Sequence, residues 1–255
     1  NAAAAPNGVL IIGNSANNVI LTTAFQDTLD GGGGSDVYLV SSPSHRPAGE
    51  AITDSGAAGS DELRFASTTN GDIITINASD SGLERVSLGT GTAAAAVLTA
   101  ATSLHINAAA STGKLELLGN YGFNVITGSS FNDLLNGNRG NDTLTGGAGN
   151  DTFRFDSSLN ATTNRDTITD FAPADDRIEL ENSIFTALTI PGPLAASAFV
   201  VDSTATTPNH RILYNSLTGT LTYDSNGSAS GGATIFATLP TGLGASMHAG
   251  LFSIT

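Results

Sequence analysis

A nine-residue period runs through residues 119–154. Four consecutive units read GNYGFNVIT, GSSFNDLLN, GNRGNDTLT and GGAGNDTFR, with glycine first, Asn or Asp sixth and an apolar residue eighth. Each unit holds a turn-forming stretch and one very short strand, which cannot bury an apolar face alone. A chain with this period must stack its units on one another, so the sequence predicts a coil of short strands.

A second array lies near the start of the sequence. Residues 13–39 divide into GNSANNVIL, TTAFQDTLD and GGGGSDVYL, and residues 56–64 add GAAGSDELR with the same pattern. Between the arrays, short strand-like pieces bounded by Gly, Asn, Ser and Asp recur at 73–76, 86–88, 104–106 and 115–117. We interpret them as the same coil with irregular loops.

The pattern changes after residue 155, where an acidic stretch is followed by turn-forming dipeptides such as Thr218-Gly219 and Asn226-Gly227. This composition is typical of β-hairpins. We therefore expect two parts: a coil over residues 1–158, irregular at about 65–118, and a β-rich cap over residues 159–255.

The repeat has a chemical consequence at its turns. Glycines at positions one, two and four allow backbone angles that side chains forbid, so the loop can turn its carbonyl oxygens inward. The apolar residue at position eight points into the core. If two units make one turn of the coil, acids 18 residues apart stack about 4.8 Å apart and repel by roughly 3 kcal/mol. A divalent cation between them would reverse the sign, and calcium tolerates such all-oxygen, irregular geometry better than magnesium.

This spacing predicts which residues share an ion. The expected pairs are Asp133 with Asp151, Asn124 with Asp142, and Asn18 with Asp36. Asparagine supplies oxygen without charge, so the two pairs that contain it should bind more weakly. Asp27 would stack on His45, which leaves its second loop missing or irregular.

Composition excludes several classes of function. The chain carries 9 basic and 23 acidic residues, a formal net charge of −14, which disfavours nucleic acid and anionic membrane partners. It has no cysteine, so disulfides and thiolate metal sites are impossible, and no apolar run is long enough to span a membrane. There is no GxSxG, HExxH or cysteine nucleophile, and the four histidines are scattered. We predict no catalytic site in this chain.

With these repeats the chain resembles the RTX, or haemolysin-type, calcium-binding repeat family of Gram-negative bacteria. GGGGSDVYLV followed by GEAITDSGAAGSDEL resembles a family block that matches Asp54 and Asp61. NRDTITDF followed by DDRIEL resembles the closing element of the repeats and matches Asp166, Asp170 and Asp176. The last residues, LFSIT, are similar to an uncleaved C-terminal signal for type I secretion.

The resemblance implies an all-β fold, a right-handed parallel β-roll with several calcium ions at its edges and a β-rich C-terminal cap. The candidate calcium-site residues are Asn18, Asp27, Gly31, Gly32, Gly34, Asp36, Asp54, Asp61, Asn124, Asp133, Gly137, Gly140, Asp142, Gly146, Gly147, Gly149, Asp151 and Asp166.

The implied function is a calcium-dependent folding module that is secreted by the type I machinery and folds outside the cell. Because the sequence begins at Asn1, any catalytic domain is expected upstream. An adhesive or surface-layer protein, with self-association or cell-surface contact, is the alternative. A β-helix enzyme acting on acidic polysaccharide fits less well, because such a substrate needs grouped basic residues and the few here are mostly separated.

Overall fold

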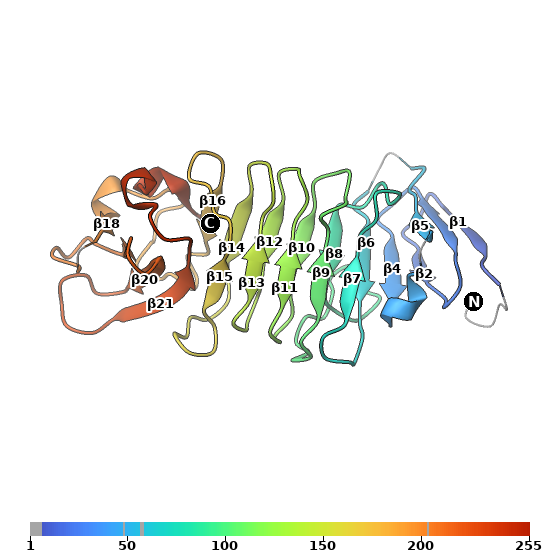
Figure 1. The fold of residues 1–255 in the computed structure, drawn as a ribbon, viewed down its shortest axis with the longest axis horizontal. Coiled ribbons are helices and arrows are strands. Elements are labelled where there is room, and N and C mark those ends of the chain that lie inside the picture. The colour runs from blue at the N-terminus through green and yellow to red at the C-terminus, as the bar shows by residue number, and fades with distance from the viewer. Residues whose placement is uncertain (1–6, 48, 57–58, 203) are drawn as a thin grey trace.

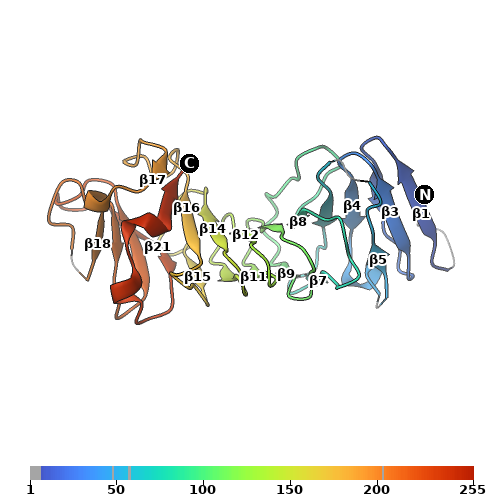
Figure 2. The ribbon, with the colours of Figure 1, turned by 90° about the horizontal axis from the view of Figure 1, so that it is seen from above.

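The computed structural model describes residues 7–255 except residues 48, 57–58 and 203. Short strands wind into an elongated coil that carries β1 at one end and a C-terminal cap at the other (Figures 1 and 2). The helical segments of the described chain are 3₁₀ turns at Pro43–His45, Ala196–Ala198, Gly244–Ser246 and Ala249–Leu251. None of its helices has the length and apolar character needed to cross a bilayer.

Within the described residues the strands form three sheets. Sheet I contains, in spatial order, β2 (Val19–Leu21), β4 (Val37–Val40), β6 (Glu62–Phe65), β8 (Arg85–Ser87), β10 (Glu116–Leu118), β12 (Leu134–Asn136), β14 (Thr152–Phe155), β16 (Arg177–Leu180), β22 (Phe252–Ile254) and β17 (Gly192–Pro193). Sheet II contains β7 (Ile73–Thr75), β9 (His105–Asn107), β11 (Val125–Thr127), β13 (Thr143–Thr145), β15 (Asp166–Ile168), β21 (Ala233–Thr238), β20 (Thr220–Asp224), β19 (Ile212–Tyr214) and β18 (Phe199–Val201). Sheet III contains β1 (Leu10–Asn14), β3 (Thr28–Gly32) and β5 (Ala51–Ile52).

Strand pairing in the arrays is parallel and follows the repeat. Leu117 of β10 pairs with Leu135 of β12, 18 residues later, and Ile126 of β11 pairs with Leu144 of β13 at the same interval. Successive nonapeptides therefore alternate between opposite sheets, and two of them complete one coil. The predicted all-β parallel roll with a β-rich C-terminal cap is confirmed.

Position eight supplies the core, as predicted. In the second array Ile126, Leu135, Leu144 and Phe153 are fully buried. The corresponding residues of the first array, Ile20, Leu29, Tyr38 and Leu63, are also buried. Each coil thus adds two large apolar side chains to one continuous core, which is what holds such short strands in register.

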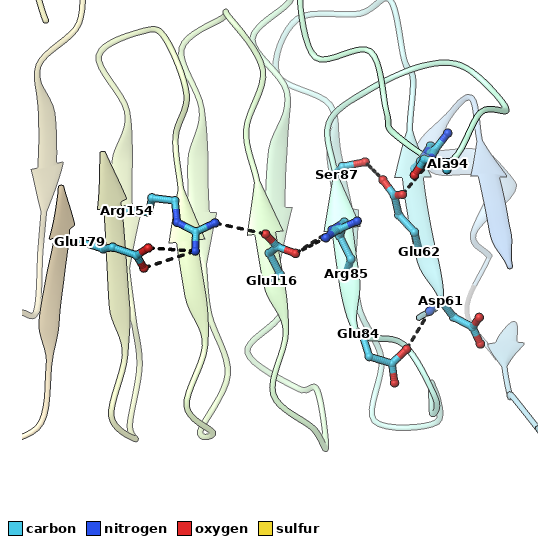
Figure 3. A network of polar contacts seen from close by, with 10 residues as sticks. Asp61, Glu62, Glu84, Arg85, Ser87, Ala94, Glu116, Arg154 and Glu179 are labelled. Carbon is cyan, nitrogen blue, oxygen red and sulfur yellow. Dashed lines mark hydrogen bonds and ion pairs between the residues drawn. The ribbon is translucent and has the colours of Figure 1, made fainter. Parts of the chain in front are cut away.

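The middle section keeps the coil but lengthens its loops. Val86 of β8 pairs with Leu63 of β6 on one side and with Leu117 of β10, 31 residues later, on the other. The Ala-rich stretch of this section lies over the outer face of sheet I. The buried Arg64 holds it there, because it donates to the carbonyl oxygens of Gly91 (2.9 Å) and Ala94 (3.2 Å) and pairs with Glu62. Figure 3 shows Glu62 and Ala94 at this contact.

Parallel stacking does not stop at residue 158, where the sequence analysis placed the end of the coil. β15 pairs with β13, and β16 pairs with β14 from Thr152–Arg177 to Phe155–Leu180. The cap then builds on these strands: β21 extends sheet II and carries an antiparallel hairpin, and the C-terminal β22 pairs in parallel with β16. Phe155, Phe185, Phe236 and Tyr223 pack edge-to-face beneath it.

Candidate metal centre

The loop before each strand forms a corner of the coil, and the sixth residue of that loop is its acid or amide. One oxygen of this side chain accepts the backbone N–H of the equivalent residue one coil earlier. Asp36 accepts from Asn18 (2.6 Å), Asp142 from Asn124 (2.8 Å) and Asp151 from Asp133 (2.9 Å). The same bond continues from Asp36 to Asp61, from Asp142 to Asp166 and from Asp151 to Asp176. Carboxylates are therefore stacked along both edges of the roll.

At some corners the loop's own backbone takes the second side-chain oxygen; we name these closed corners. Oδ2 of Asp133 accepts the N–H (2.6 Å) and the hydroxyl (2.8 Å) of Ser129, four residues earlier. Asp27 is held in the same way by Thr23. Asn124 and Asn18 have a single side-chain oxygen, and it accepts the loop N–H of Asn120 and of Asn14.

At the corners of Asp36, Asp142 and Asp151, Oδ2 is buried and has no hydrogen-bond partner among the described residues. We name these open corners. The residue four positions earlier has a left-handed backbone: φ is +86° at Gly32, +64° at Asn138 and +102° at Gly147.

That rotation turns the N–H away from the carboxylate, so the N–H of Asn138 instead donates to its neighbour Asn136. The fourth residue of each open loop, Gly34, Gly140 or Gly149, is also left-handed.

The glycines of the open corners have no room for a side chain. A Cβ on Gly31, Gly137 or Gly146 would lie 2.2–2.4 Å from Oδ2 of the open carboxylate in the same loop. A Cβ on Gly147 would lie 2.0 Å from the carbonyl oxygen of Ser129 in the preceding coil. Oxygen atoms from two coils thus converge on these corners.

Around Asp36 the acids form a cluster. Asp36, Asp54 and Asp61 each place one carboxylate oxygen within 4.8 Å of the others, and Oδ1 of Asp54 also has no partner in the described chain. Burial raises the pKa of Asp61 to about 7, helped by the nearby charges of Asp54, Asp36 and Glu84. Three acids this close cannot all stay ionised in the fold without a counter-charge.

The two open corners of the second array show the same conflict. Burial, and then the adjacent Asp166, raise the pKa of Asp142, and burial raises that of Asp166. Burial raises the pKa of Asp151 to about 7, with further contributions from Asp176, Asp133 and Asp170. At neutral pH each corner needs either a proton or a cation. Carboxylate and carbonyl oxygens without nitrogen or sulfur donors fit a hard divalent ion such as calcium.

The predicted register holds for three pairs and is wrong for one. Asn18 stacks on Asp36, Asn124 on Asp142 and Asp133 on Asp151, as the 18-residue interval predicts. Asp27, however, stacks on Glu50 instead of His45, because Thr28 pairs with Ala51. The chain detours through the 3₁₀ turn Pro43–His45, which moves the next strand five residues along.

Sequence reasoning missed several residues of these corners. Asn138 acts as the left-handed residue of an open loop although it is not glycine. Asp170 accepts the N–H groups of Gly146 and Gly147 (both 2.9 Å), and Asp176 closes the corner after Asp151. Both acids lie in the segment that resembles the closing element of the repeats. Their contacts were not predicted, because the partners lie in loops 23 to 25 residues earlier in the chain. Glu50 carried no repeat signal at all.

Comparison with known proteins agrees with this geometry. The family model of the RTX calcium-binding nonapeptide repeat matches residues 12–40 and 118–153, in 4 copies. These segments contain the open corners of Asp36, Asp142 and Asp151. A search of curated proteins found no match. The two stacked arrays are calcium-binding nonapeptide repeats of the RTX, or haemolysin-type, kind.

Proposed function

We propose that the chain folds when calcium fills its open corners. The observation that carries this proposal is the buried, unpartnered Oδ2 of Asp36, Asp142 and Asp151. Asp36 would hold its ion together with Asp54 and Asp61, Asp142 with Asp166, and Asp151 with oxygens of the adjoining coils. Glycine at positions one and four, and a left-handed residue at position two, leave the space beside each open carboxylate.

The free energy of calcium binding is large enough to control folding. With about 1 mM calcium and an affinity near 10 µM, each filled site adds about 2.7 kcal/mol to the free energy of unfolding. A few such sites are comparable with the whole stability of a typical domain, about 5–15 kcal/mol. Free calcium at cytosolic levels would leave the corners empty, and the stacked acids would then oppose folding.

This dependence supports export of the unfolded chain by the type I machinery and folding outside the cell. The C-terminal strand β22, at the position of the expected secretion signal, is paired with β16, and its Phe252 and Ile254 are buried. A machinery that reads this segment must therefore act before the chain folds. The secreted module would support a larger protein whose activity resides upstream.

The test is circular dichroism of the whole chain with calcium and with excess chelator. We expect the β-signal to be lost on chelation and restored when calcium, but not the same concentration of magnesium, is returned. An unchanged spectrum in chelator would refute calcium-driven folding.

Self-association at the N-terminal end is a second candidate. Strand β1 lies at the edge of sheet III, and its Leu10 and Ile12 are 66% and 64% exposed. Exposed apolar edge strands favour pairing with another chain. Sedimentation of the calcium-loaded chain and of L10T/I12T distinguishes an adhesive role from a monomeric folding module: concentration-dependent oligomers that the double variant abolishes would support it.

A further inference from the structure

The corner formed by Asp27 and Glu50 contains an arginine, Arg46. Asp27 and Glu50 are stacked there, since β3 and β5 pair through Thr28 and Ala51. The next coil contributes Asp80, which accepts the N–H of Ile52 (3.0 Å). Asp27 and Glu50 therefore stack as Asp133 and Asp151 do, whereas Asp80 joins the corner through the backbone of Ile52.

Arg46 lies between two of these acids. Its guanidinium Nη1 is 3.2 Å from Oε1 of Glu50, and Nη2 is 2.5 Å from Oδ2 of Asp80. The side chains of Arg46, Glu50 and Asp80 are 3%, 0% and 1% exposed. Oε2 of Glu50 and Nε of Arg46 find no partner among the residues described. The positive charge is therefore buried at the point where two coils present carboxylates to each other.

The chain brings Arg46 there by the detour that breaks the repeat. Arg46 follows the 3₁₀ turn Pro43–His45, in a coil five residues longer than the repeat interval, and this extra length shifts Glu50 into the place of the sixth residue. The loop that would have been a second nonapeptide corner is thus replaced by a segment that supplies its own cation. The neighbouring Asp27 is closed by Thr23 and offers no open oxygen.

We propose that Arg46 is a built-in cation that takes the place of calcium at this corner, so that the corner of Asp27, Glu50 and Asp80 closes without a metal ion. A guanidinium fixed by two carboxylates is always charged and needs no ion from solution. Its removal would leave an all-carboxylate pocket that a divalent cation can enter. The comparison with calcium corners rests on the proposed function, but the arginine's contacts do not.

The test compares how the free energy of unfolding depends on calcium concentration in the whole chain and three variants. The slope of this dependence gives the number of ions bound on folding. We expect R46Q to bind one more calcium ion than the wild type, and its loss of stability at 0.01 mM calcium to be recovered at 10 mM. R154Q, which breaks the partly exposed pairs of Arg154 with Glu116 and Glu179, should keep the wild-type slope (Figure 3).

D151N separates the two proposals. A lower slope in D151N with an unchanged slope in R46Q would leave calcium folding intact and overturn the role of Arg46. An unchanged slope in D151N would count against the proposed function instead. If R46Q does not fold even at 10 mM calcium, its slope cannot be measured. Hydrogen exchange of the folded wild type then decides whether the proposal stands.

Hydrogen exchange of the folded wild type gives that independent measurement. Within the calcium range in which the chain stays folded, the amides of Thr23 and Ile52, which donate to Asp27 and Asp80, should keep constant protection. Those of Asn18 and Asp133, which donate to open carboxylates, should lose protection as calcium falls. Equal calcium dependence of all four amides would refute the proposal.

Discussion

Two neighbouring corners of the second array differ in the backbone conformation of their loops. The loops that end at Asp133 and Asp151 stack directly on each other and make the same ladder bond. In the first, the N–H of Ser129 closes onto the carboxylate, whereas in the second the left-handed Gly147 leaves Oδ2 without a partner in the described chain. An aspartate at position six is therefore not sufficient for an ion site. The backbone at position two decides whether its second oxygen is available.

The residue type at position six of each corner agrees with this distinction. Closed corners carry asparagine at Asn18 and Asn124, where the side chain needs only an acceptor oxygen for nearby N–H groups. The open corners found among the described residues all carry aspartate. A charge is kept where a cation is expected and is dispensable where the loop supplies its own hydrogen bonds.

The largest effect is expected from neutralising the open corners. D36N/D142N/D151N should abolish the calcium dependence of folding, because about 2.7 kcal/mol per site is lost at 1 mM calcium. The closed-corner variant D27N/D133N removes the same charge from corners whose Oδ2 is already bonded to the loop. It should retain the wild-type calcium dependence in denaturant titrations. Equal loss in both variants would remove the distinction between corners.

A change in pH is expected to alter the stability of the fold strongly, and in opposite directions with and without calcium. The pKa of Asp61 and Asp151 is about 7 in the calcium-free fold, against an ordinary value of 3.8. The folded state then holds more protons than the unfolded state between these values, so calcium-free stability should fall as pH rises from about 4 to about 7. With saturating calcium, stability should instead fall as pH drops, because protons compete with the ion.

Circular dichroism and thermal unfolding at pH 5 and pH 8, each with chelator and with calcium, measure both signs; in chelator the β-signal is expected at pH 5, where protons replace the cation, and is expected to be lost at pH 8. A calcium-free chain that is more stable at pH 8 than at pH 5 would contradict the buried, unpaired state of these acids.

A smaller effect is expected from converting a closed corner into an open one. S129G/F131G changes GSSFND to GGSGND and supplies glycine at positions two and four. Without calcium it should lose about 1–2 kcal/mol from the added backbone entropy of two glycines. With calcium it should recover this loss by binding one additional ion at Asp133. Isothermal titration against the wild type counts the ions, and an unchanged count would show that these two positions do not control the corner.

An effect of similar size is expected at Asn138. Its φ of +64° is tolerated by asparagine but costs an alanine roughly 1–2 kcal/mol. The Asn138 side chain also donates to the carbonyl oxygen of Gly119 (2.8 Å). N138A should therefore destabilise the chain by about 2 kcal/mol, with N138G close to the wild type. If the free energy of unfolding of N138A equals that of the wild type, this loop does not need the left-handed conformation.

Much of this architecture could be predicted from the period alone. The nine-residue interval determines which side chains face the core and which corners stack, so residues such as Leu135 and the pair Asp133–Asp151 were placed correctly. Open and closed corners could not be separated in this way. GNYGFN and GNRGND both have asparagine second and glycine fourth, yet Gly122 is not left-handed and Gly140 is.

The reason for this difference lies in the sixth residue. The amide of Asn124 donates to Asn120 (3.0 Å) and to the carbonyl oxygen of Leu104 (2.8 Å), which closes its loop. The carboxylate of Asp142 cannot donate when ionised. Arg46 and Glu50 were beyond prediction for another reason: their meeting with Asp80 depends on a detour in the chain and on a residue more than 30 positions away.

The central claim is that an unpartnered aspartate oxygen in a loop whose second residue is left-handed, rather than any acid at position six, marks an ion site. A crystal structure of the whole chain grown with calcium, with anomalous scattering to identify the ions, tests it most directly. We predict ions in contact with Oδ2 of Asp36, Asp142 and Asp151 and none bound by Asp27. Density for calcium beside Asp27, or open corners whose oxygens face water alone at saturating calcium, would contradict the account.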